Sequence, residues 1–200
     1  MKRVQLESTD ALLIIDMQVD FLPGGSLGVP DGHAVLAPIN RLIALFGKGG
    51  LPVYASRDWH PENHCSFTAR AGPWPPHCVA GTRGAAFSDA LALPPDAIVV
   101  SKADTADVDA YSAFNGTGLA GQLRASGVAR VAVCGLATDY CVLNTVLDAR
   151  ANGFDVLLVP EAMRAVDVEP GDGERAFGRM IERGALPVQV DELLAVAASA

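Results

Sequence analysis

Short runs of consecutive apolar residues alternate along the chain with longer segments in which apolar residues recur every three or four positions. The short runs predict β-strands at Leu12–Ile15, Pro52–Ser56, Ala97–Ser101, Val128–Cys134, Phe154–Val159 and Pro187–Val190. The longer segments predict helices at Ala34–Phe46, Gly118–Ala125, Asp139–Asn152 and Glu174–Arg183, and a small C-terminal helix from Glu192 that Asp191 caps.

The predicted strands are apolar throughout instead of alternating between apolar and polar residues. This pattern is typical of a parallel sheet whose two faces are both covered by helices. We therefore expect a three-layer α/β/α fold with a six-stranded, mainly parallel sheet. Since there is no internal repeat or linker, residues 1–200 are expected to form a single domain. Ligands of such folds bind at the carboxyl ends of the strands.

Composition narrows the class of protein. The chain is 50% hydrophobic and has a formal net charge of -8, which argues against a nucleic-acid partner because phosphate binding needs a basic surface. No apolar stretch approaches membrane-spanning length, and the N-terminal stretch has no signal-peptide core. The four cysteines are few and irregularly spaced, so we expect free thiols and a cytoplasmic protein. No dinucleotide-binding or P-loop motif is present.

Three of the four histidines lie in proline-rich loops after the second predicted strand, together with an aspartate. Asp58, His60 and His77 offer the ligands that a borderline divalent cation such as Zn²⁺, Fe²⁺ or Mn²⁺ prefers. A solvated turn is the ordinary alternative. The absence of a C-x-x-C motif favours an open site with three protein ligands over a structural zinc cluster. Further ligands could come from His64, Cys65 and Cys78, whereas His33 is expected at the surface.

Three other polar residues follow apolar strands or begin a helix, and parallel strands would bring them to one edge of the sheet. Cys141 is either a buried core cysteine or a nucleophile whose thiolate is favoured by the start of a helix. Lys102 either reaches water or lowers the pKa of that thiol. Asp16 either caps a turn or carries a proton to and from the thiol. Cys134, inside a strand, is expected in the core.

The sparse aromatic residues Phe21, Trp74 and Tyr111 fall in loops near these residues. Core packing is the ordinary explanation for each of them. Together they could instead form the walls of a pocket for a small, flat ligand.

The chain resembles the nicotinamidases (pyrazinamidases) among the isochorismatase-like cysteine hydrolases over nearly its whole length. The Asp and Cys motifs mark the wider superfamily, and the D-W-H-P and W-P-P-H-C segments are more specific because many sister hydrolases lack this metal site. The matching segments are Ile14–Phe21, Gly24–Leu27, Arg57–Phe67, Trp74–Thr82, Lys102, Asp109–Phe114 and Gly135–Val142.

This resemblance implies a reaction and a set of roles. The reaction is hydrolysis of nicotinamide to nicotinate and ammonia through a cysteine thioester, in NAD salvage, with pyrazinamide as a further substrate. One divalent metal ion (Zn, Fe or Mn) per chain would bind the pyridine nitrogen. The implied roles are a catalytic triad of Asp16, Lys102 and Cys141; an oxyanion hole from the N–H groups of Ala137 and Cys141, with a cis peptide before Ala137; substrate contacts from Phe21, Trp74 and Tyr111; and metal ligation by Asp58, His60 and His77.

Three alternatives remain open at this stage. A related hydrolase of the same superfamily could use the same triad on another small amide. A metal-bound water could be the nucleophile, with Cys141 merely structural. A binding module on this fold could lack catalysis altogether, although it would have no reason to keep Asp16, Lys102 and Cys141. The identity of the metal, the part played by His64 and the existence of a homo-oligomer are not determined by the sequence.

Overall fold

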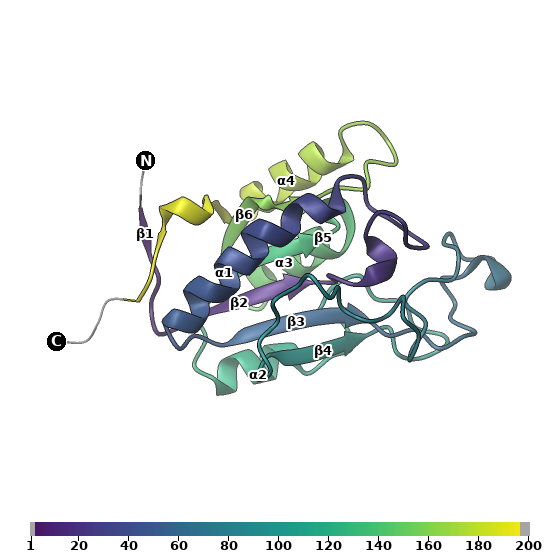
Figure 1. Ribbon diagram of the computed structural model, residues 1–200, viewed down its shortest axis with the longest axis horizontal. Coiled ribbons are helices and arrows are strands. Elements are labelled where there is room, and N and C mark those ends of the chain that lie inside the picture. The colour runs from purple at the N-terminus through teal and green to yellow at the C-terminus, as the bar shows by residue number, and fades with distance from the viewer. Residues whose placement is uncertain (1–2, 197–200) are drawn as a thin grey trace.

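A computed structural model describes residues 3–196 and contains a six-stranded sheet in the order β4-β3-β2-β5-β6-β7 (Figure 1). All five pairings in this sheet are parallel, as the continuous apolar runs predict. The strands are β2 (Asp10–Ile15), β3 (Val53–Asp58), β4 (Ile98–Lys102), β5 (Arg130–Leu136), β6 (Asp155–Arg164) and β7 (Leu186–Pro187).

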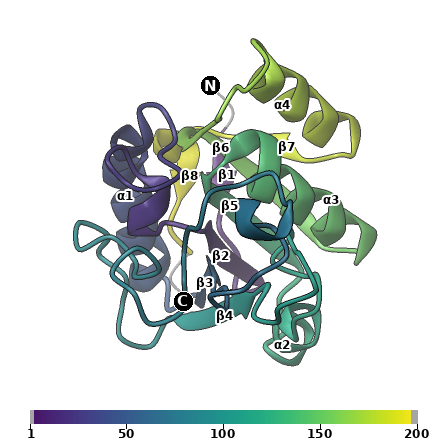
Figure 2. The ribbon, with the colours of Figure 1, turned by 90° about the vertical axis from the view of Figure 1, so that its right-hand side faces the viewer.

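Helices cover both faces of the sheet, which makes the three layers seen end-on in Figure 2. One face carries α1 (Leu36–Lys48); the other carries α2 (Leu119–Ala125), α3 (Leu143–Ala151) and α4 (Asp172–Glu182). Strand β2 shows why its residues are apolar throughout. Leu12 and Ile14 pack into the core under α1, whereas Leu13 and Ile15 pack into the core under the other helices. The α/β/α fold expected from the sequence is confirmed.

Several boundaries differ from those predicted. Strand β6 continues five residues past Val159, and β3 continues to Asp58, so that residue ends a strand instead of beginning a loop. The segment predicted as one helix from Asp139 begins with a π-helical turn, Thr138–Val142, before α3. Hydrophobic periodicity does not distinguish these cases, because a π turn shifts the register of a helix by only one residue.

The predicted C-terminal helix is wrong over the described residues. A 3-10 turn, Val190–Glu192, is followed by strand β8 (Leu193–Leu194), which pairs with β1 (Val4–Gln5) in a separate two-stranded sheet. The turn is closed by a capping box between Gln189 and Glu192, so Asp191 is not its cap. Residues 197–200 lie outside the described part of the chain.

Parallel topology brings the carboxyl ends of β2, β3, β4 and β5 to one edge of the sheet. Asp58 and Lys102, the last residues of their strands, are register partners. Strands β2 and β5 approach so closely there that a Cβ on Gly135 would lie 2.1 Å from the carbonyl oxygen of Ile15, and Gly135 has a φ of +114°. Glycine is therefore required at this position.

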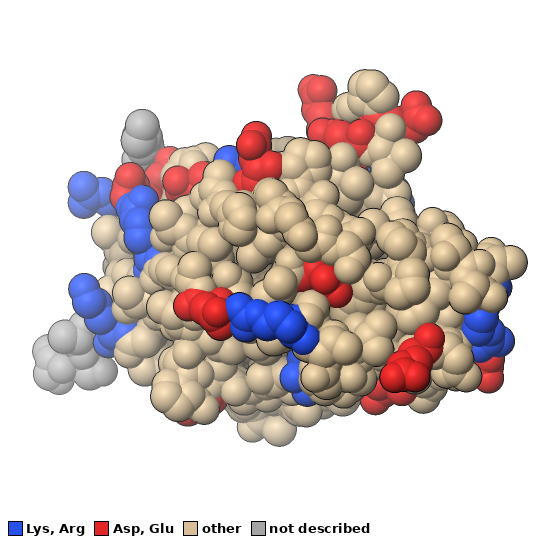
Figure 3. Space-filling model, turned by 45° about the vertical axis from the view of Figure 1, so that its right-hand side comes forward, with Lys and Arg blue, Asp and Glu red and all other residues tan. Residues whose placement is uncertain are grey.

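The surface is consistent with the composition. On the face shown in Figure 3, basic side chains are separated by acidic and uncharged ones and form no continuous basic patch. Within residues 3–196, no helix is long and apolar enough to cross a membrane.

Candidate active site and metal centre

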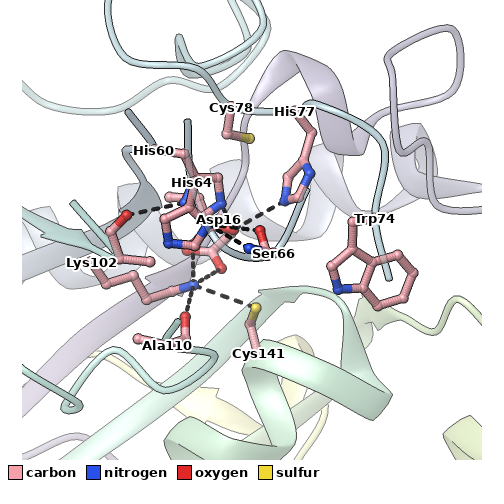
Figure 4. Close-up of polar contacts among 12 residues, drawn as sticks. Asp16, His60, His64, Ser66, Trp74, His77, Cys78, Lys102, Ala110 and Cys141 are labelled. Atoms are coloured by element: carbon pink, nitrogen blue, oxygen red, sulfur yellow. Dashed lines mark hydrogen bonds and ion pairs between the residues drawn. The ribbon is translucent and has the colours of Figure 1, made fainter. Parts of the chain in front are cut away.

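Lys102 is the central polar group of the site. Its buried ammonium group lies 3.0 Å from Asp16 Oδ2, 2.5 Å from Asp58 Oδ1 and 3.5 Å from the Cys141 Sγ atom, and it also donates to the Ala110 carbonyl at 3.2 Å (Figure 4). Burial alone would lower the pKa of Lys102, but Asp16 and Asp58 together raise it well above its ordinary value. The lysine is therefore a permanent cation that joins two carboxylates and a thiol.

Asp16 follows β2 and is completely buried. One oxygen, Oδ1, accepts a hydrogen bond from Ser56 Oγ at 2.6 Å. The other, Oδ2, has no hydrogen-bond partner among the described residues, although it forms the ion pair with Lys102. Burial raises the pKa of Asp16, and Lys102 opposes the increase. A carboxyl group with a raised pKa and one oxygen that accepts no hydrogen bond is suited to accept and return a proton.

Cys141 lies in the π turn between β5 and α3, and its side chain points toward Lys102 (Figure 4). Potential ligand atoms of Asp16, Asp58 and Cys141 all lie within 4.8 Å of one another. Burial raises the pKa of the Cys141 thiol well above its ordinary value, and the Lys102 ammonium partly offsets this. Burial thus favours the neutral thiol, and the Asp16 carboxylate lies close enough to take its proton.

The Leu136–Ala137 peptide that precedes this turn is cis, as the sequence resemblance implies. Ala137 and Cys141 both line the cavity described below. The main chain next to the thiol therefore borders the space in which a ligand would lie.

Asp58, His60 and His77 form a second buried cluster beside the first. Asp58 Oδ2 lies 3.4 Å from His60 Nε2 and 3.9 Å from His77 Nε2, and the three potential ligand atoms are within 4.8 Å of one another. Burial raises the pKa of Asp58, but opposing interactions, chiefly with the Lys102 ammonium, hold the pKa well below its usual range. Burial lowers the pKa of His77, which favours the neutral ring.

The donor set fits a divalent cation. His60 Nδ1 is 3.1 Å from the Ala103 carbonyl and His77 Nδ1 is 2.8 Å from the Pro75 carbonyl. Since a carbonyl can only accept, each Nδ1 carries the hydrogen and each Nε2 presents a lone pair to the cluster. His60 Nε2 is buried without a hydrogen-bond partner among the described residues, which is the state expected of a metal ligand.

His64 does not join this cluster. The backbone N–H of Ser66 donates to its Nδ1 at 3.3 Å, so Nε2 carries the hydrogen and donates to the Val108 carbonyl at 3.1 Å. The ring stacks on His60 with a centroid distance of 4.1 Å. The described cluster also excludes Cys65 and Cys78, and burial raises the pKa of the Cys78 thiol. His64 thus acts as a support beneath His60 in this structure.

A cavity connects the two clusters, and the three predicted aromatic residues Phe21, Trp74 and Tyr111 line it together with Cys141, Asp58, His60 and His77. Trp74 donates to the Tyr111 hydroxyl at 3.0 Å. Tyr140, which the sequence reasoning did not assign, contacts the Trp74 ring edge-on at 5.3 Å. Its position beside Cys141 in the sequence was the available signal. Leu27, Val29 and Val166 complete an apolar wall to which the sequence assigned none of the three, although Leu27 lies in the matching segment Gly24–Leu27.

Two further residues hold the site from outside and were also missed. Gln18 receives a hydrogen bond from the Asp58 N–H at 2.8 Å and donates to the Asp58 carbonyl at 2.8 Å, which fixes the end of β3. Asp20 accepts from the backbone N–H of Cys78 at 2.8 Å, next to His77. Both lie in the segment after β2, and the family resemblance includes them in the matching segment Ile14–Phe21 but gives neither a role.

The chain belongs to the isochorismatase-like hydrolases, because the Isochorismatase domain family matches residues 10–192. Within that family it is similar to a nicotinamidase of Escherichia coli, with 40% identity over 88% of this chain and 92% of the relative. It is also similar to the structure of a pyrazinamidase of Pyrococcus horikoshii in complex with zinc, with 49% identity, a TM-score of 0.87 and coverage of 90% and 99% of the two chains. It is similar as well to the structure of PnC1 from L. infantum in complex with nicotinate, with 42% identity, a TM-score of 0.90 and coverage of 96% of this chain and 99% of that one.

Proposed function

We propose that this chain is a nicotinamide amidohydrolase, which converts nicotinamide and water to nicotinate and ammonia, and that it hydrolyses pyrazinamide as well. One observation carries the proposal. A single aromatic-lined cavity connects the Cys141 thiol, which lies beside the Lys102 ammonium and the Asp16 carboxylate, to the cluster of Asp58, His60 and His77. The similarity to nicotinamidases supports the same reaction. In a cell this activity would serve NAD salvage, and the four free cysteines are consistent with a cytoplasmic location.

In the first half-reaction Asp16 Oδ2 takes the thiol proton of Cys141, and the sulfur attacks the carboxamide carbon. The N–H groups of Ala137 and Cys141 stabilise the resulting oxyanion. Asp16 then gives its proton to the departing nitrogen, so that ammonia leaves and a thioester to Cys141 remains. Lys102 stabilises negative charge as it passes between sulfur and carboxylate, since its ammonium lies within 3.5 Å of both.

In the second half-reaction Asp16 takes a proton from water, and the water oxygen attacks the thioester carbonyl carbon. The tetrahedral intermediate collapses with the Cys141 sulfur as leaving group, and Asp16 returns the proton to that sulfur. The product is nicotinic acid, which releases a proton to solvent to become nicotinate, and the enzyme regains its thiol. Burial raises the pKa of Asp16, which suits a group that must both accept and release a proton in each half-reaction.

The substrate ring lies among Phe21, Trp74 and Tyr111, whose side chains exclude water from its faces. One divalent ion per chain (Zn, Fe or Mn), held by Asp58, His60 and His77, would supply a Lewis acid for the pyridine nitrogen, and the zinc complex of the Pyrococcus relative favours zinc. An amide without a ring nitrogen has less need of these ligands.

The experiment that tests this function is ammonia release from a panel of amides that includes nicotinamide and pyrazinamide, with the wild-type protein and two variants. Cys141→Ala should lose at least about 10³-fold in kcat, because no other group in the cavity can form the thioester. Cys134→Ala is the matched control. Cys134 is also buried but lies within β5 and does not line the cavity, so its variant should retain wild-type turnover.

The panel also separates the rival functions. Substantial turnover by Cys141→Ala would show that a metal-bound water is the nucleophile. Preference for an amide that lacks a ring nitrogen would identify a related small-amide hydrolase. A wild-type protein without turnover of any amide in the panel would contradict the proposal.

A further inference from the structure

Asp139 lies two residues before Cys141 in the π turn, yet its carboxylate does not face the catalytic cluster. Instead it accepts two backbone N–H groups of the segment that follows β6: Val166 N–H donates to Oδ1 at 3.0 Å and Asp167 N–H donates to Oδ2 at 2.8 Å. Both carboxylate oxygens are thus engaged by consecutive residues of one loop. Hydrogen bonds to an ionised acceptor are among the stronger ones in proteins.

The loop residue that Asp139 holds is part of the cavity wall. The Val166 side chain lines the cavity and packs against the main core cluster, as does that of Tyr140. Tyr140 and Cys141 follow Asp139 directly in the chain. Asp139 therefore connects the turn that carries the thiol to the part of the cavity wall that follows β6. Val166 is not paired with a neighbouring strand in the described structure, because β6 ends at Arg164.

The far side of the loop is held separately. Asp167 has a φ of +52° and accepts the Gly173 N–H at 2.8 Å at the start of α4. A Cβ on Gly173 would lie 2.5 Å from the Ala165 Cβ, so α4 packs closely on the loop. Val168, which follows Asp167, is 59% exposed. The loop is thus attached on one side to α4, through Asp167 and Glu169, and on the other to the catalytic turn, and only the second attachment bears directly on Val166.

We propose that Asp139 is a positioning residue that sets the width of the substrate pocket by holding Val166 against the ring-binding cavity. This inference rests on the proposed function for its kinetic test, but the structural link itself does not depend on the identity of the amide. Asp139 touches neither substrate nor reacting atoms, so its effect is on binding of the ring and not on the thiol chemistry.

The kinetic test uses Asp139→Asn. An amide keeps one acceptor oxygen but turns a donor NH₂ toward the second backbone N–H, so one hydrogen bond is lost and the other is no longer charge-assisted. The expected result is a rise in KM for nicotinamide of about tenfold, with kcat within about threefold of wild type. Val166→Ala should raise KM as well, and the double variant should be no worse than Val166→Ala alone, because both changes act through the same wall.

Asp172→Asn is the matched control. Its carboxylate accepts the Glu169 N–H at 3.0 Å in the same loop, but it does not hold a residue of the cavity wall, so KM should stay at the wild-type value. Multiplicative KM effects in the double variant, or a fall in kcat with KM unchanged, would overturn the inference.

A second measurement is independent of catalysis. Amide hydrogen exchange in the segment 165–168 should accelerate in Asp139→Asn and remain at the wild-type rate in a Cys141→Ser protein. Unchanged exchange in Asp139→Asn would overturn the inference. If the wild-type protein does not hydrolyse nicotinamide, the proposed function fails and the exchange experiment alone decides the role of Asp139.

Discussion

Replacement of Lys102 by methionine tests the electrostatic core of the site. Methionine has a similar length and fills the same buried space, but it removes the cation that lies between Asp16, Asp58 and Cys141. The buried Asp16 carboxylate then loses its ion-pair partner, and the thiolate formed in the proposed reaction loses its nearest cation. We expect a large loss of activity in a protein that still folds.

The magnitude follows from the distances. For an ammonium and a thiolate 3.5 Å apart, Coulomb attraction is roughly 5 kcal/mol at an effective dielectric constant of about 20. The neighbouring carboxylates already neutralise part of the lysine charge, so a net loss of about 3–4 kcal/mol is expected in the transition state. That corresponds to a fall in kcat/KM of roughly 10²–10³-fold.

The assay is steady-state ammonia release, with thermal unfolding and metal content measured on the same samples. Arg130→Met is the matched control, because Arg130 also forms an ion pair with a buried aspartate, Asp10, although its own side chain is partly exposed, and this pair lies at the amino ends of β2 and β5, away from the site. Its loss should destabilise the protein by about 3 kcal/mol and leave kcat at the wild-type value. If folded Lys102→Met retains kcat/KM within tenfold of wild type, the assignment of the lysine to catalysis is refuted.

Three further outcomes are expected. Strong chelation should suppress activity at low nicotinamide concentration and added divalent metal should restore it; undiminished turnover of a metal-free protein would contradict metal-assisted binding. His77→Ala should lose bound metal by elemental analysis, whereas His64→Ala should keep it, because both His64 nitrogens are engaged by other groups; equal loss from both would refute this distinction. Gly135→Ala should lower the free energy of unfolding by at least about 3 kcal/mol in a urea titration, since its Cβ would collide with Ile15, and a neutral effect would show that β2 and β5 can separate.

The layered fold and the principal residues of the site could be predicted because each rests on a local signal. Continuous apolar strands indicate a sheet covered on both faces, and parallel strands place their polar final residues at one edge. Lys102 was expected near Asp16 and Cys141 on this ground alone, and the structure brings all three together. The pairing of Asp58 with Lys102 required the strand order, which the pattern of one sequence does not contain.

The residues that were missed act through contacts that are distant in sequence. Val166 comes to the cavity from the end of β6, and its position depends on a hydrogen bond to Asp139, 27 residues earlier. The C-terminal segment illustrates the opposite problem. Its composition suits a helix, but the 3-10 turn ends at Glu192 and Leu193–Leu194 pair with β1 from the other end of the chain. Tertiary pairing here overrides local preference.

Convergence at the carboxyl edge has a consequence for how this protein is handled. The cavity takes residues from five stretches of the chain, around Phe21, His60–His77, Asp109–Tyr111, Leu136–Cys141 and Val166. A chain in which β5 and β6 have not joined the sheet has neither the Cys141 thiol nor Val166 in place at the cavity. Turnover is therefore a sensitive gauge of native topology, and its loss in denaturant should coincide with the cooperative loss of secondary structure.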